Sequence, residues 1–268
     1  MNNLHRELAP VSDAAWTEIA DEAARTFRRH LAGRRVVDVQ GPAGESLSAV
    51  GTGHIREIEP PDDGVLARQR HVLSLVELRV PFSLDREQVD DVARGARDSD
   101  WQPVKDAARQ LAFAEDRAIF DGYAAADIDG IRPAASTPTI ALPANATAYP
   151  VAVAQALSEL RSAGVNGPYS VVLSAEAYTA ASETSDHGYP VIEHLRRLIS
   201  DEIVWAPAIE GGLVLTRRGG DFELQLGQDA SIGYLSHTET SVRLYLQESL
   251  TFLMLTSEAA VPLTPSAS

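Results

Sequence analysis

The clearest alternation of apolar and polar positions lies near the C-terminal end of the chain. Apolar residues there recur at every second position, the period of a strand with one buried face: Phe222, Leu224 and Leu226. A glycine pair at 219–220 precedes this run and supplies backbone freedom. Gly227 and Gly233 interrupt the alternation, and we interpret both as strand ends.

A longer alternating run follows over residues 242–254. One face is apolar and carries Val242, Leu244, Leu246, Leu250, Phe252 and Met254, whereas the other carries Arg243, Tyr245, Gln247, Ser249 and Thr251. Glu248 falls on the apolar face. A carboxylate at such a position is either paired with an arginine or marks a β-bulge that reverses the register.

Two helical patterns precede these strands. The first begins at Ser12 or Asp13 and runs to about Leu31, and its apolar face carries Trp16, Ile19, Ala20, Ala23, Phe27 and Leu31. The second runs over residues 103–120 with its own apolar stripe. Beside that stripe lie Glu115, Asp116 and Arg117, which we interpret as a solvated or interfacial ion-pair face.

The middle of the chain predicts an arm and a second, smaller domain. Residues 47–58 and 65–80 form two extended segments joined by a turn at 60–64, a hairpin with little to bury unless a neighbouring subunit covers it. Residues 122–145 are rich in Ala, Pro and Thr and indicate a domain boundary. Mixed helices and strands follow, and the tail from 262 to 268 is expected to be disordered.

Composition narrows the function classes. The 268 residues include no cysteine, which excludes disulfides and thiolate metal sites, and no stretch approaches a membrane span, so we expect a cytoplasmic protein. A net charge of −15 argues against a nucleic-acid partner. Lys105 is the only lysine and follows no glycine-rich loop. No catalytic motif and no metal-ligand spacing is present, so we expect no catalytic residue, no metal and no cofactor.

Several short motifs, in order along almost the whole chain, resemble those of the encapsulins, and most closely of the actinobacterial ones. Encapsulins are prokaryotic shell proteins that share the capsid fold of the tailed bacteriophage HK97. The segments that carry the resemblance are Leu8-Ala-Pro10, Trp16, 33–39 (GRRVVDV), 79–82 (RVPF), Arg94-Gly95, 98–101 (DSDW), 114–120 (AEDRAIF), 167–169 (GPY), 188–190 (GYP), 205–207 (WAP) and 217–247.

The resemblance implies an α+β, HK97 phage-capsid-like fold with a peripheral domain, an extended loop arm and an axial domain. We expect the N-terminal helix and the start of the peripheral domain in residues 1–46, the arm in 47–80 and the peripheral domain with its spine helix in 81–124. The axial domain is expected in 125–218, the C-terminal strands of the peripheral domain in 219–262 and a disordered tail in 263–268.

The resemblance also implies a binding groove on the inner wall of a shell. In encapsulins the helix that corresponds to the N-terminal one forms a groove for the targeting peptide at the C-terminus of cargo proteins. The residues implied in cargo-peptide binding are Phe27, Leu31, Arg34, Asp38 and Ile232. From periodicity alone, the same helix face packs against the core of its own chain.

A polar loop at 182–189 is implied to rim a pore at the five-fold axis. The residues implied to form the pore loop are Glu183, Asp186, His187, Gly188 and Tyr189, because a ring of such side chains can select ions or small substrates. Without the resemblance, the same segment is an exposed loop with no role.

The implied function is that of a non-enzymatic, self-assembling shell subunit, expected as a homo-oligomeric 60-mer (a T=1 shell). Its cargo would be a dye-decolorising peroxidase or a ferritin-like protein, linking the compartment to oxidative stress or iron storage. Some relatives bind flavin through a tryptophan at the position of Glu87, and some phage relatives join subunits through a lysine in the arm, which this arm lacks. The alternatives are an HK97-type phage capsid protein and a soluble hydrolase.

Overall fold

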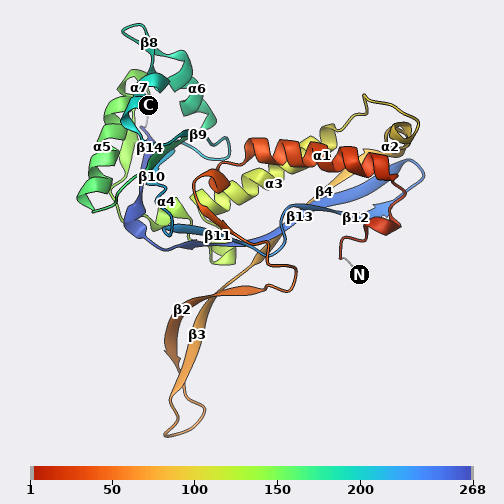
Figure 1. Cartoon of the computed structure of the whole chain (residues 1–268). Coiled ribbons are helices and arrows are strands. Elements are labelled where there is room, and N and C mark those ends of the chain that lie inside the picture. Colours follow the sequence, from red (N-terminus) through yellow and green to blue (C-terminus); the bar gives the residue numbers. More distant parts are fainter. Residues whose placement is uncertain (1–2, 267–268) are drawn as a thin grey trace.

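Two five-stranded sheets form the two main parts of the molecule, and a two-stranded hairpin projects away from both (Figure 1). The computed structural model describes residues 3–266. Within that range, no helix has both the length and the apolar content needed to cross a bilayer. The described N-terminal residues lie along the first sheet, where the carbonyl oxygen of Leu4 accepts a hydrogen bond from the backbone of Tyr234.

The first sheet is built around one long strand, β13 (Ser241–Met254). It pairs antiparallel with β4 on one side, and with β12 and β11 in turn on the other; β1 then adds parallel to β11. The bounds of its partners are Asp38–Gln40 (β1), Val76–Asp85 (β4), Phe222–Leu226 (β11) and Ser231–His237 (β12). The alternation predicted over 242–254 therefore belongs to one uninterrupted strand.

Glu248 distinguishes between the two interpretations of that strand. The register between β13 and β4 continues without a shift past Glu248, which lies opposite Leu78. Its side chain is buried and pairs with Arg34. The arginine pair is therefore the correct alternative, and the register shift in this part of the sheet lies instead in β12, between Tyr234 and Ser236.

The sequence predicts a strand end at Gly233, but this residue is an interior position of β12. A Cβ added there would overlap the aromatic ring of Tyr245, its neighbour on β13. The glycine is therefore needed because the ring lies flat against the backbone. Gly227, by contrast, directly follows the last residue of β11 and agrees with the prediction.

Helices α1 (Asp13–His30) and α3 (Gln102–Phe120) lie side by side across this sheet (Figure 1). Ser12 caps α1, since its hydroxyl oxygen accepts a hydrogen bond from the backbone N–H of Ala15 at 3.3 Å. A shorter helix, α2 (Arg86–Ala93), is capped by Asp85, which accepts from two backbone N–H groups of the first turn. The apolar faces of these helices meet β4, β12 and β13 in one core.

The projecting hairpin consists of β2 (Ala49–Ile58) and β3 (Ala67–Ser74), paired antiparallel. It leaves the body of the molecule as a long ribbon (Figure 1). Large apolar side chains on it face solvent in the single chain, among them Ile55, Leu66 and Val72, of which Leu66 is 88% exposed. An isolated two-stranded ribbon is marginal in water, so this arm is incomplete on its own.

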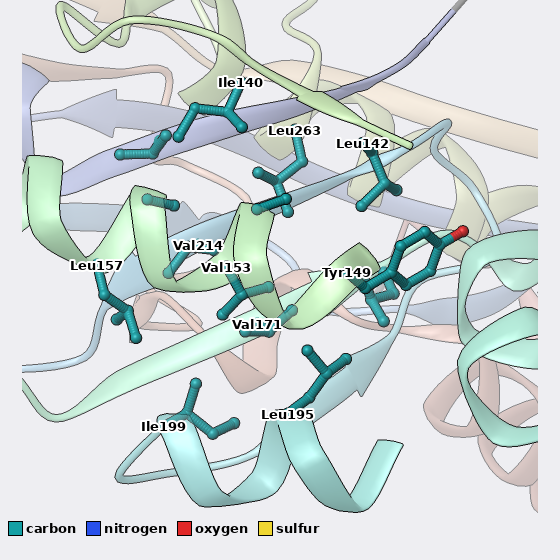
Figure 2. Packing of buried hydrophobic residues seen from close by; sticks show 14 of the residues in the cluster. Ile140, Leu142, Tyr149, Val153, Leu157, Val171, Leu195, Ile199, Val214 and Leu263 are labelled. Carbon is teal, nitrogen blue, oxygen red and sulfur yellow. The ribbon is translucent and has the colours of Figure 1, made fainter. Parts of the chain in front are cut away.

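The second sheet has the order β5-β14-β10-β6-β9. Its strands are Ile140–Leu142 (β5), Tyr169–Leu173 (β6), Ile203–Trp205 (β9), Gly212–Thr216 (β10) and Ala260–Pro265 (β14). Every residue of β6 and β10 is buried, as expected for central strands covered on both faces. Figure 2 shows Val153 and Leu157 of α5 directed toward Val171 and Val214 of this sheet, with Leu195 of α7 on the same core.

The helices of this part are α5 (Tyr149–Ser162), α6 (Ala175–Glu183) and α7 (Val191–Leu198). A hairpin of two very short strands, β7 (Ser185–Asp186) and β8 (Tyr189–Pro190), connects α6 to α7. The remaining short elements are α4 (Ile131–Ala134) and the 3-10 turns Arg6–Leu8, Gly33–Arg35, Ala124–Ala126, Ala146–Ala148 and Ser257–Ala259.

The expected disordered tail is wrong for the residues described. Strand β14 lies between β10 and β5, and Ala260, Val261 and Leu263 are fully buried. The chain therefore returns from the first sheet to complete the second, and residues 260–262 do not belong to the peripheral strands. Residues 260–263 pair with β10, and residues 263–265 are ordered by pairing with β5. Residues 267 and 268 lie outside the described part of the chain.

Candidate functional site

A groove of about 650 Å³ lies between α1 and β12, and we call it the α1–β12 groove. Its walls are mainly apolar and include Leu4, Ala20, Ala23, Ala24, Phe27, Leu31, Ala230, Ile232 and Leu246. Arginines and one aspartate also line it: Arg6, Arg28, Arg34, Arg35 and Asp229. Four of the five residues implied in cargo binding, Phe27, Leu31, Arg34 and Ile232, therefore meet in one place.

The side chains on the floor of this groove also belong to the core of the first sheet. Phe27, Leu31 and Ile232 are each only 5–6% exposed and pack in the same apolar cluster as β13. The two interpretations of the N-terminal helix are therefore compatible, because one helix face supports the core and bounds the groove. Ala20 and Ala24 are less buried and leave the groove open by being small.

Arg34 stands at the end of the groove and joins three distant carboxylates. Its Nε and Nη2 donate to both oxygens of Glu115, at 2.6–3.1 Å, and its Nη1 donates to Asp229 at 2.8 Å. Nη2 also reaches Glu248 at 3.3 Å. Glu115 and Glu248 are fully buried, so the planar guanidinium holds α3, β13 and the residues before β12 together in a low-dielectric site.

Of the solvated or interfacial ion-pair face predicted at 115–117, the solvated alternative is wrong for the two carboxylates. Asp116 is fully buried like Glu115 and accepts hydrogen bonds from the backbone N–H groups of Ala32 and Gly33 at 2.9 and 2.8 Å. It thereby fixes the turn that follows α1. Burial raises the pKa of Asp116 to about 7, although the two backbone hydrogen bonds oppose that rise. Arg117 is directed differently and donates to the carbonyl oxygen of Ala208.

If Glu248 and Glu115 were both ionised, the cluster would carry more negative charge than Arg34 can neutralise. Burial, and then the charge of the adjacent Glu115, raise the pKa of Glu248 well above its ordinary value. Its Oε1 atom is buried without a hydrogen-bond partner among the described residues. One cation against two fully buried carboxylates favours retention of a proton on Glu248.

Asp38, the fifth residue implied in cargo binding, does not line the α1–β12 groove. It lies on β1 and accepts a hydrogen bond from the backbone N–H of Gly220 at 2.6 Å. It borders a separate recess of about 50 Å³ beside Thr216 and Asp221. Asp38 therefore stabilises the turn before β11, and Asp229, which the sequence reasoning missed, is the acidic residue of the groove.

The residues implied to form a pore loop are gathered at the β7–β8 hairpin. Glu183 ends α6, and Asp186 pairs with Tyr189 across a turn in which His187 and Gly188 both have positive φ angles, 47° and 83°. Two left-handed residues in succession are typical of a tight hairpin turn. The His187 side chain is 96% exposed, so this tip presents polar groups to solvent.

The described residues contain no cluster of three or more His, Cys, Asp or Glu side chains arranged to hold a metal ion. Glu87, at the position where some encapsulins carry a flavin-binding tryptophan, is an exposed residue in the first turn of α2. Its backbone N–H donates to the capping carboxylate of Asp85 at 2.8 Å.

Comparison with known proteins identifies the relatives of this chain. Residues 1–251 match a family model described as encapsulating protein for peroxidase. A type 1 encapsulin shell protein of Rhodococcus erythropolis is 63% identical over 98% of this chain and 100% of its own length. The type 1 encapsulin shell protein of Mycobacterium tuberculosis is 61% identical with the same coverage.

Solved structures share the fold at much lower identity. A virus-like particle from Pyrococcus furiosus matches with a TM-score of 0.64 and 15% identity over 91% of this chain and 97% of its own. The capsid of the myovirus phage XM1 matches with a TM-score of 0.55 and 11% identity over 90% of this chain and 92% of its own. The architecture is therefore the α+β capsid fold of HK97-like phages.

Proposed function

The chain belongs to the encapsulin shell family, and we propose that it closes an icosahedral cytoplasmic compartment and captures a cargo enzyme in its α1–β12 groove. As a shell protein of this family it is a structural subunit that assembles with copies of itself, not a hydrolase or another enzyme. The phage-capsid alternative has less support, because the phage relatives share the fold alone.

For the assembly we propose a 60-mer with T=1 symmetry. The observation that supports intersubunit closure is the arm, whose apolar side chains at Ile55, Leu66 and Val72 are exposed in the single chain. A neighbouring copy that covers them would bury this surface and stabilise the ribbon. The arm contains no lysine, so packing and hydrogen bonds hold the shell.

For the cargo we propose a peroxidase, of the dye-decolorising class, or a ferritin-like protein, held by a C-terminal targeting peptide. The groove itself carries this proposal. It is apolar along its floor and edged by arginines and Asp229, which suits an extended peptide whose apolar side chains enter the groove while polar groups remain at the rim. A cavity of about 650 Å³ accommodates a few aliphatic side chains.

The experiment that tests the groove substitutes Ala24 rather than the core residues. Ala24→Glu places a charged side chain in the groove without creating a core cavity. Co-expression with a fluorescent protein that ends in the last residues of a candidate peroxidase measures capture. We expect the variant to assemble and to lose most of the co-purifying fluorescence, because the larger, charged side chain occupies part of the groove and opposes burial of apolar side chains there.

Ala14→Glu is the matched control, since Ala14 is an exposed residue of the same helix and does not line the groove. This control should capture cargo like the unmodified shell. Undiminished capture by assembled Ala24→Glu shells would contradict the groove assignment and leave the shell function intact.

We further propose that the β7–β8 hairpins rim a pore at the five-fold axis, where Glu183, Asp186, His187, Gly188 and Tyr189 set its polarity. The exposed, polar hairpin tip supports this proposal. Glu183→Gln with Asp186→Asn should slow entry of ferrous iron into cargo-loaded shells, since a ring of carboxylates concentrates cations. Glu239→Gln, on the exposed turn before β13, is the control, and equal rates in all three shells would contradict a pore role.

A further inference from the structure

A second groove, of about 320 Å³, lies between α1 and α3 and is separate from the α1–β12 groove. We call it the α1–α3 groove. Basic side chains dominate its walls, which include Arg25, Arg29, His30, Lys105, Asp106 and Arg109. Such a concentration of positive charge stands out in a chain whose net charge is −15. The groove has no part in the proposed assembly or cargo capture.

Both acidic residues of this groove are already paired. Glu22 forms an ion pair with Arg25 and accepts a hydrogen bond from the hydroxyl group of Thr26 at 3.1 Å. Asp106 pairs with Arg109 at 3.1 Å, and the Gln102 amide donates to the same oxygen. Each of these two ion pairs is neutral in total, so the positive charges of Arg29 and Lys105 remain in excess.

Lys105 is the most unusual of these residues. It is the only lysine of the chain, it is half-buried, and neither its side chain nor that of Arg29 forms an ion pair or hydrogen bond within residues 3–266. The Lys105 ammonium and the Arg29 guanidinium therefore have no protein counter-charge in direct contact. An anion in the groove would supply the missing partner to both cations.

His30 supplies a third polar group to the α1–α3 groove. Its Nδ1 lies 2.8 Å from the carbonyl oxygen of Thr26, which can only accept, so Nδ1 carries the proton. Ring contacts with Phe113 and Trp205, both at 5.9 Å between centroids, hold the imidazole in place.

The groove lies at the N-terminal end of α3, and this position adds to the positive electrostatic potential in the groove. Gln102 is the first residue of α3, and Lys105 lies in its first turn. The N-terminal end of a 19-residue helix carries partial positive charge, although the Asp100 carboxylate already accepts a hydrogen bond from the first backbone N–H, that of Gln102, at 2.9 Å. The dipole and the side-chain charges therefore favour the same kind of ligand.

We propose that the α1–α3 groove binds a phosphate-class oxyanion between Lys105 and Arg29, either free inorganic phosphate or the phosphate group of a small phosphomonoester. The planar guanidinium of Arg29 can donate two parallel hydrogen bonds to such an anion, and the Lys105 ammonium adds a point charge. The groove volume lies at the lower end of the range for small-molecule sites, about 300–1,000 Å³, which favours a small ligand.

The test is calorimetric titration of inorganic phosphate into assembled, cargo-free shells, with chloride at the same ionic strength as the reference. We expect saturable binding with one site per chain. Lys105→Gln and, separately, Arg29→Gln should each weaken binding about tenfold or more, whereas Lys105→Arg, which keeps the charge, should retain most of it. Arg29 is exposed, so its variant reports on binding even if the Lys105 variant assembles poorly.

Arg97→Gln is the matched control, because Arg97 is an exposed arginine with no ion pair in the described chain and does not line the groove. It should bind phosphate like the unmodified shell. Binding that is not saturable, or an equal loss in Arg97→Gln, would overturn the proposal. A parallel titration with glycerol 3-phosphate separates the two sources: tighter binding identifies a phosphomonoester site, and equal or weaker binding identifies a site for the free ion.

Discussion

Arg34→Met tests whether the buried charge cluster stabilises the first sheet. Within the described chain, Arg34 is the only cation that pairs with Glu115 or Glu248, and both carboxylates are fully buried. Methionine preserves most of the side-chain length but removes every donor. The substitution therefore leaves two carboxylates in a low-dielectric site without their counter-charge.

The expected loss of stability in Arg34→Met follows from the burial of Glu115 and Glu248. Removing one partner of a buried ion pair costs about 3–5 kcal/mol, because the remaining charge stays desolvated. The proton favoured on Glu248 leaves a single negative charge, which places this case near the lower value. For a chain of this size about 1 kcal/mol corresponds to roughly 2–4 °C, so we expect the melting temperature to fall by roughly 6–12 °C.

The assay is scanning calorimetry of cargo-free shells at neutral pH. Arg35→Met is the matched control, because the neighbouring Arg35 is 47% exposed and pairs with Glu202, itself 35% exposed. Such a pair contributes at most about 1 kcal/mol, so the control should melt within a few degrees of the unmodified shell. Equal shifts in the two variants would refute the reasoning.

Three further perturbations test other parts of the structure. Burial raises the pKa of Glu248, so the folded chain holds a proton that the unfolded chain releases above about pH 4. The contribution of this group to the free energy of unfolding is therefore fully present below that pH and is lost as pH rises through the folded pKa. Glu248→Gln should flatten this fall in melting curves recorded from pH 5 to 8. Gly233→Ala should lower the melting temperature by the equivalent of about 1–3 kcal/mol, since its methyl group overlaps the Tyr245 ring, and an unchanged value would show that β12 yields easily. Truncation after Ala259 removes β14 and should expose the second sheet to limited proteolysis, whereas truncation after Ser266 keeps every described residue and should remain resistant; equal resistance would contradict the central position of β14.

The sequence predicted those elements whose signals are local. The helical period and the Ser12 cap located α1 to within a residue at its end, and alternation over 242–254 located all but the first residue of β13. Both signals depend on neighbours within a few positions, and burial of one face then follows. The interior position of Gly233 could not be inferred in this way, because the ring that requires it belongs to another strand.

The partners of the buried charged residues could not be predicted from local sequence patterns. Glu115 and Asp116 lie on a helix face that is polar by pattern, but their partners Arg34 and Gly33 are 81 and 83 positions away. No periodicity contains that pairing. Strand β14 was missed for a related reason, since a short run that includes Pro262 looks like coil until β10 and β5 are known to flank it.

For the candidate site, the resemblance supplied four groove residues that local pattern could not have assembled. Phe27, Leu31, Arg34 and Ile232 come from α1, the turn after it and β12, and only the fold brings them together. Asp38 was misplaced because β1 leads away from the groove toward β11. Asp229 was missed in the sequence, although it pairs with Arg34 at the groove.

The most direct measurement is electron microscopy, with sedimentation, of the purified chain beside a variant that lacks residues 57–68 at the tip of the arm. If arms packed on neighbouring subunits close the shell, the full chain forms uniform hollow particles and the variant yields only small oligomers. A full chain that stays monomeric, or a variant that forms the same closed particles, would contradict the account.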